Sequence, residues 1–152
     1  MSTCFFIGHR EAPDELLAEL TAVIERHISE FGVTGFVVGN YGNFDKLAAH
    51  SVKAAKKRHP EVTLILLLPY HPYDRPTPVP SDFDGTFYPP GMESVPKRAA
   101  IVQANRYMAA HCDYLIAYVW HPASNAKKIL EYAKSKATAI ITELSSYRNN
   151  SG

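Results

Sequence analysis

Short apolar runs alternate along the chain with longer segments in which apolar residues recur at helical spacing. The runs fall at residues 3–7, 36–38, 62–68, 114–119 and 137–141. Unbroken apolar runs of this length are typical of strands that a parallel sheet buries on both faces. The intervening segments predict amphipathic helices over about 13–31, 43–58 and 96–112, and again after residue 125.

This alternation of strand and helix predicts an α/β fold. We expect a three-layer Rossmann-like domain over residues 1–144, in which a five-stranded parallel sheet of order 3-2-1-4-5 carries helices on both faces. A proline- and tyrosine-rich insertion, residues 69–95, follows the third strand, and we expect a structured loop there with room for a short hairpin. A polar tail, 145–152, follows the domain.

Composition narrows the class of protein. The chain has 152 residues, of which 46% are hydrophobic, and this suits one folded domain. The 16 basic and 15 acidic side chains leave a formal net charge of +1, which disfavours a nucleic-acid partner. Cys4 and Cys112 form neither a disulfide framework nor a zinc motif, so no metal site is predicted. The chain has no signal-peptide or membrane-spanning pattern, so we expect a cytoplasmic protein with no membrane partner.

The candidate chemistry lies in the loops that follow the predicted strands, because ligands of such sheets bind at the carboxyl ends of the strands. After the second strand, the glycine-rich turn 39–45 lets backbone N–H groups approach an anion at a helix start. Its candidate ligand-binding residues are Gly39, Asn40, Gly42, Asn43 and Asp45. The alternative is a tight turn in which Asn43 caps the helix, and Asp45 would then stabilise the helix dipole.

The first loop places Gly8, His9 and Arg10 directly after the first strand. A guanidinium binds phosphate or carboxylate well, although Arg10 could instead pair with Glu11 or Asp14. His9 could equally be a turn histidine bonded to the backbone. The catalytic residues are unknown, with Asp45, His9 and Arg10 as candidates.

Further candidates lie at the same edge of the predicted sheet. Arg98 and Asn105 are seven residues apart on the third predicted helix and should share a face. Ser124 and Asn125 come just before the fourth helix, in the loop after the fourth strand.

Four segments, in order, resemble the YpsA-like branch of the SLOG superfamily, a Rossmann-like group that includes the DNA-processing protein Smf/DprA and the LOG phosphoribohydrolases. These segments are Cys4-Phe5-Phe6-Ile7-Gly8-His9-Arg10, Gly39-Asn40-Tyr41-Gly42-Asn43-Phe44-Asp45, Asn105-Arg106-Tyr107-Met108 and Cys112-Asp113-Tyr114-Leu115-Ile116-Ala117-Tyr118-Val119. The resemblance implies a nucleotide or nucleotide-derived ligand in the cleft, and a homodimer or larger homo-oligomer.

The chain departs from the family pattern in two places. Ser124-Asn125-Ala126 stands where the family has a glycine-rich loop, so we expect anion binding at this helix start either to be weakened or to move from backbone to side chains. The catalytic Arg and Glu of the LOG hydrolases align near Ala104 and Ile129, so a LOG-type phosphoribohydrolase is disfavoured.

Three functions remain open. The leading hypothesis is binding or sensing of a nucleotide-like small molecule, with the insertion as a lid, a subunit contact or a rigid surface loop; no cofactor is otherwise predicted. The alternatives are a hydrolase that cleaves an N-glycosidic or phosphate bond of such a ligand, and an assembly or nucleic-acid adaptor. Whether the protein is an enzyme stays open.

Overall fold

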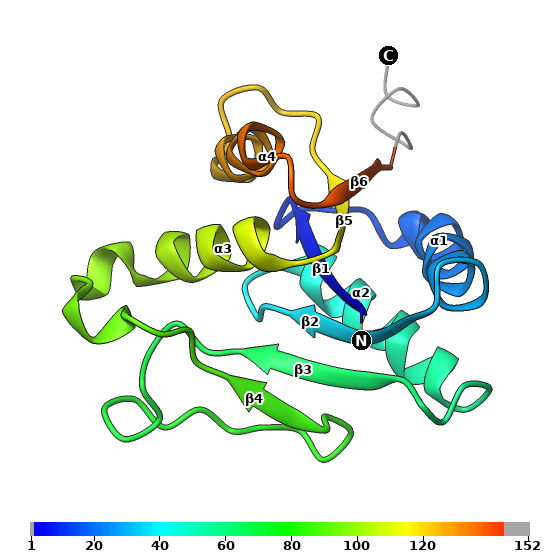
Figure 1. Ribbon diagram of the computed structural model, residues 1–152, viewed down its shortest axis with the longest axis horizontal. Coiled ribbons are helices and arrows are strands. Elements are labelled where there is room, and N and C mark those ends of the chain that lie inside the picture. Colours follow the sequence, from blue (N-terminus) through cyan, green and yellow to red (C-terminus); the bar gives the residue numbers. More distant parts are fainter. Residues whose placement is uncertain (1, 145–152) are drawn as a thin grey trace.

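The computed structural model describes residues 2–144, so the predicted tail at 145–152 lies outside the described residues. The described chain alternates strands with helices, as the sequence pattern predicts, except that no helix separates the third strand from the fourth (Figure 1). The strands are β1 (Ser2–Gly8), β2 (Val33–Val38), β3 (Thr63–Leu67), β4 (Gly85–Phe87), β5 (Tyr114–Tyr118) and β6 (Ile140–Glu143). The α-helices are α1 (Leu17–Ser29), α2 (Asn43–Lys56), α3 (Ala100–His111) and α4 (Asn125–Lys136). Three 3₁₀ turns are η1 (Asp14–Leu16), η2 (Met92–Ser94) and η3 (Lys97–Ala99).

The strands form a six-stranded sheet of order β4-β3-β2-β1-β5-β6, and every neighbouring pair is parallel. The prediction of five strands is therefore wrong by one, because the insertion contributes β4 beyond β3. The short hairpin allowed for there is also wrong, since β4 pairs in parallel with β3. The Asp84 carboxylate fixes this edge, where it accepts the Leu64 N–H (2.7 Å) and the Lys56 ammonium (2.6 Å).

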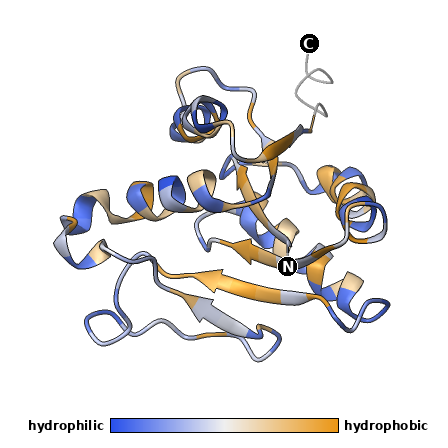
Figure 2. Ribbon diagram, viewed as in Figure 1, coloured by the Kyte–Doolittle hydropathy of each residue, from blue (hydrophilic) through white to orange (hydrophobic). Residues whose placement is uncertain are grey.

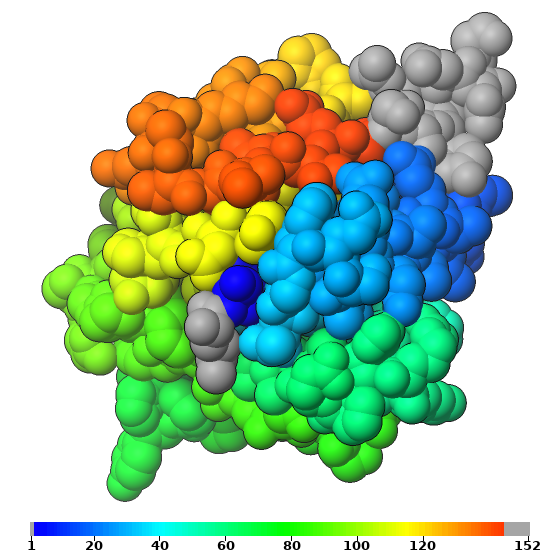
Figure 3. All heavy atoms as spheres, turned by 45° about the vertical axis from the view of Figure 1, so that its right-hand side comes forward, coloured from blue at the N-terminus to red at the C-terminus, as the bar shows by residue number. Residues whose placement is uncertain are grey.

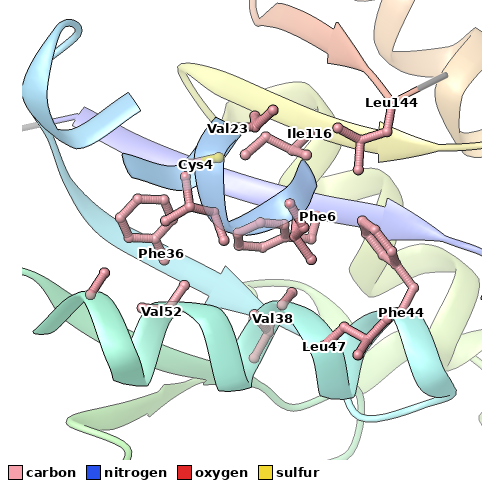
Figure 4. Close-up of a cluster of buried hydrophobic side chains, with 14 of the residues drawn as sticks. Cys4, Phe6, Val23, Phe36, Val38, Phe44, Leu47, Val52, Ile116 and Leu144 are labelled. Atoms are coloured by element: carbon pink, nitrogen blue, oxygen red, sulfur yellow. The ribbon is translucent and has the colours of Figure 1, made fainter. Parts of the chain in front are cut away.

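Two apolar layers hold the helices on the sheet. On one face, α1 and α2 pack against side chains such as Phe6, Phe36 and Val38 (Figure 4). On the other face, α3 and α4 pack against Phe5, Ile7 and other strand residues. Alternate residues of β1 thus enter opposite layers, as the period of a strand requires. Figure 2 shows strongly apolar β2 and β3 beside a pale β4, which explains why the apolar pattern missed this strand.

The last predicted strand starts later than expected. Helix α4 continues to Lys136 and ends at Ala137, whose φ of 56° is left-handed, and β6 begins only at Ile140. Helices often end on such a left-handed residue, usually glycine, and the alanine here gave no sign of it in the sequence.

At the amino-terminal edge of the sheet, two hydrogen bonds join β1 to the residue that precedes β5. The Thr3 N–H donates to the Asp113 carboxylate, and the Asp113 N–H donates to the Thr3 carbonyl, each over 2.9 Å. In Figure 3 the start of β1, in dark blue, lies between the chain before β5, in yellow, and the end of α1. None of the helices in the described part of the chain is long and apolar enough to cross a membrane.

Candidate functional site

A cavity of about 390 Å³ lies at the carboxyl edge of the sheet, where the loops after β1, β2 and β5 meet α3. Seven of the predicted site residues line it: Gly8, His9, Arg10, Asp45, Asn105, Ser124 and Asn125. The other lining residues are Phe6, Ile7, Glu11, Tyr41, Ile101, Val102, Trp120, His121, Ala126 and Ile129. Apolar and polar side chains therefore line the cavity together, which is typical of small-molecule sites.

Two glycines let the chain pack closely around this cavity. A Cβ on Gly8 would lie 2.3 Å from the buried Phe44 ring. Gly42 has φ of 139°, and a Cβ there would lie 2.6 Å from the Arg10 Cα. The turn before α2 thus packs directly on the loop after β1, and the Asn43 N–H donates to the Arg10 carbonyl over 2.9 Å.

Asp45 projects from the first turn of α2, and one of its oxygens, Oδ2, accepts the Tyr41 N–H over 3.0 Å. Burial raises the pKa of Asp45 from 3.8 to about 6, although the Tyr41 N–H and the Arg10 charge both act to lower it. The second oxygen, Oδ1, accepts no hydrogen bond from residues 2–144, so it is available to a ligand. A carboxyl group with a pKa near 6 beside a cavity can bind a hydroxyl or exchange a proton.

Arg10 is exposed at the rim of the cavity. Within the described residues it forms no ion pair with Glu11 or Asp14, the two alternatives that the sequence offered. Its charge acts to lower the pKa of Asp45. The guanidinium thus lies at the site near Asp45, and its N–H groups, which donate to no acceptor in residues 2–144, are free for an anionic ligand.

His9 is a buried anchor for the opposite loop. Its Nε2 accepts the backbone N–H of Trp120 (2.9 Å) and that of His121 (3.2 Å). Two N–H donors on one nitrogen require an unprotonated Nε2, and burial lowers the pKa of His9 accordingly. The imidazole is therefore neutral and orients the β5–α4 loop, which fits the predicted alternative of a turn histidine bonded to backbone.

Helix α4 begins at the cavity, and the side chain of Ser124 caps its first turn. The Ser124 hydroxyl accepts the Lys127 N–H (3.1 Å) and donates to the His121 carbonyl (2.8 Å). The hydroxyl therefore shapes the loop, whereas the Asn125 side chain beside it has no hydrogen-bond partner in residues 2–144.

Five predicted site residues do not line the cavity: Gly39, Asn40, Gly42, Asn43 and Arg98. Asn43 does not cap α2; its side-chain amide donates to the Ala12 carbonyl (2.6 Å) and to the Asp14 carboxylate (2.9 Å). Arg98 lies in the 3₁₀ turn η3, where a turn takes three residues, so the helical spacing expected between Arg98 and Asn105 does not apply. Asn105 alone faces the cavity.

Two aromatic residues at the rim were not among the predicted site residues. Tyr41 is 38% exposed and Trp120 is 46% exposed, and both line the cavity. Large aromatic side chains exposed beside a cavity are suited to stacking on a planar ligand. Their place in the loops after β2 and β5 was the only sign of this in the sequence.

The fold and the position of the cavity define a Rossmann-like α/β domain with a candidate ligand site at the carboxyl edge of its sheet. No known family model matches the chain, and no curated protein matches its sequence. Within residues 2–144, no three His, Cys, Asp or Glu side chains come together as a metal site.

Proposed function

We propose that this protein binds a nucleotide or nucleotide-derived small molecule in the cavity at the carboxyl edge of the sheet. The observation that carries the proposal is the meeting of Arg10, Asp45 and the two exposed aromatic rings in one cavity at the position where such folds bind ligands. The volume of about 390 Å³ suits a ligand of nucleoside size. The four matching segments support membership of the SLOG superfamily, which we propose on the same grounds.

Each group has a role in this proposal. The Arg10 guanidinium binds phosphate, and Asp45 Oδ1 accepts a hydrogen bond from a ribose hydroxyl. Tyr41 or Trp120 stacks on the base, and the amide of Asn105 pairs with one of its polar edges. Apolar lining residues such as Ile101 and Ile129 reduce the access of water to these contacts.

Titration calorimetry with AMP, GMP, CMP, UMP and ADP-ribose tests the proposal. Arg10→Ala should weaken the binding of a phosphorylated ligand by about tenfold or more, because a charge-assisted hydrogen bond is lost. Arg26→Ala is the matched control, since Arg26 is an exposed arginine of α1 that does not line the cavity. Absence of binding tighter than millimolar for all five ligands, or equal binding by both variants, would refute the proposal.

The pKa of Asp45, about 6, favours hydrolysis of the bound ligand as a second candidate function. In N-glycosidic cleavage, the oxygen of a water molecule bonds to C1′ while the bond from C1′ to the base breaks. Asp45 takes a proton from the water, and the base leaves with the bonding electrons and takes up a proton from solvent, to which Asp45 then returns its own, giving a sugar phosphate and a free base. Arg10 binds the phosphate, whereas the neutral His9, with its Nε2 occupied, is not placed to stabilise charge.

Product analysis separates the two functions. A hydrolase releases free base or inorganic phosphate at a rate that Asp45→Asn abolishes, while Arg26→Ala retains it. Intact ligand after prolonged incubation with the wild-type protein would exclude hydrolysis and leave binding as the function.

A further inference from the structure

The insertion carries a second guanidinium, that of Arg75, at the carboxyl edge of the sheet. The Arg75 Cζ lies 3.9 Å from the centre of the Tyr70 ring, and the Tyr70 hydroxyl donates to the Lys97 carbonyl over 3.2 Å. The backbone N–H groups of Asp74 and Arg75 both donate to the His71 carbonyl over 3.0 Å. The turn therefore fixes the backbone of Arg75, and the Tyr70 ring packs against its guanidinium. We call Tyr70 and Arg75 the insertion stack.

The insertion stack sits at the same edge of the sheet as the cavity. Tyr70 follows β3, which pairs with β2, and the loop after β2 carries Tyr41. Burial raises the pKa of the Tyr41 hydroxyl, and the nearby Arg75 charge opposes that rise. Tyr41 is therefore bonded to Asp45 through its backbone N–H, and its hydroxyl lies within reach of the Arg75 charge. Tyr70 is itself bonded to η3, the turn before α3, and residues of α3 line the cavity. In Figure 1 the chain after β3 runs beside the segment that leads into α3.

The polar edge of Arg75 is unused by the protein. Its side chain is exposed, and its N–H groups donate to no acceptor within residues 2–144. A guanidinium stacked on a ring loses little side-chain entropy when it binds, and its free edge matches the paired oxygens of a phosphate.

We infer that Arg75 recognises a second anionic group of the ligand, so that the site takes a nucleoside diphosphate or a longer phosphate ester in preference to a monophosphate. The first phosphate lies at Arg10, and the phosphate chain extends past Tyr41 to the insertion stack. This inference rests on the proposed function and deepens it, because it gives the insertion a role in ligand specificity.

The test compares the binding of AMP and ADP by calorimetry, in wild-type protein and in variants. Arg75→Ala should weaken ADP binding by about tenfold, because a charge-assisted contact to phosphate is lost, and change AMP binding less than about twofold. Arg75→Lys keeps the charge without the planar fork and should give an intermediate loss. Tyr70→Leu removes the platform and should weaken ADP binding more than AMP binding. Arg26→Ala again serves as the control of equal charge.

The outcomes separate the inference from the function on which it rests. If the wild-type protein binds AMP and ADP but Arg75→Ala leaves the ratio of the two affinities unchanged, the inference is wrong and the proposed function stands. If the wild-type protein binds neither, adenine nucleotides are excluded and the inference falls with them. The inference is supported if Arg75→Ala weakens the binding of ADP alone, and if the difference between wild type and variant shrinks at high salt, as expected for an ionic contact.

Discussion

Substitution of Asp45 by asparagine should make the protein more stable at neutral pH. The wild-type carboxyl group is held beside the cavity, where one oxygen accepts the Tyr41 N–H and burial disfavours its charge. Asparagine has nearly the same shape and keeps an oxygen for the same N–H, but carries no charge. The variant therefore removes a destabilising charge while leaving the turn before α2 intact.

The magnitude follows from the pKa. The folded protein holds the pKa of Asp45 at about 6, against 3.8 without the protein environment. Because a pKa difference of one corresponds to about 1.4 kcal/mol, ionisation of Asp45 at high pH costs the folded state at most about 3 kcal/mol. The folded state binds the proton more tightly than the unfolded chain, so this cost is full above pH 6 and disappears as the pH falls towards 4.

Urea unfolding of the wild-type protein and of Asp45→Asn, at intervals between pH 4 and pH 8, measures the effect. The variant should gain up to about 3 kcal/mol in free energy of unfolding at pH 8, and the gain should vanish near pH 4. Asp74→Asn, at an exposed turn position, should show no such pH dependence. A difference between wild type and Asp45→Asn that stays constant over this range would refute a buried, ionised Asp45.

Three further predictions concern the structure around the site. Gly42→Ala should destabilise the protein by about 2 kcal/mol or more, seen in urea unfolding, because its positive φ and the Arg10 backbone leave no room for a Cβ. Ser124→Ala should cost about 1 kcal/mol in the same assay, through loss of the cap on α4. Burial lowers the pKa of His27, whose Nε2 has no partner in the described residues, so the contribution of His27 to stability, measured in the Asp45→Asn background, should fall as the pH drops below about 6.5, where the unfolded chain gains the proton first. His27→Asn keeps a donor for the Val23 carbonyl and should flatten that pH dependence.

The layers of the fold were predictable because burial leaves a direct record in the sequence. β1, β2, β3 and β5 are continuous apolar runs, and the helices between them carry one apolar face each. The sixth strand left no such record. β4 has only three residues, all partly or fully exposed at the sheet edge, and polar contacts from Asp84 fix its position.

The site was predictable in part, since the order of strands and helices determines which loops meet at the carboxyl edge. This order of elements brings Arg10, Asp45 and Asn105 to one cavity. Which side chains face that cavity depends on local geometry that periodicity does not encode. The 3₁₀ turn before α3 removes Arg98 from it, and the exposure of Trp120 depends on a loop that His9 holds from the neighbouring strand.

Two glycine-containing motifs, residues 8–10 after β1 and residues 39–45 after β2, contribute to the site. Some of their residues shape the loops, and others present polar groups to the cavity. Gly8 makes room for Phe44, and His9 ties the loop after β1 to the loop after β5. Asn43 ties the start of α2 to the loop after β1. Their hydrogen-bonding groups and close contacts are used within the protein, so substitution of these residues should disturb the shape of the site and the stability together. Arg10 and Asp45, from the same motifs, keep polar groups free, and their substitution should change ligand affinity while the fold persists. The ratio of lost affinity to lost stability is therefore the quantity that separates the two sets, whichever ligand the cavity takes.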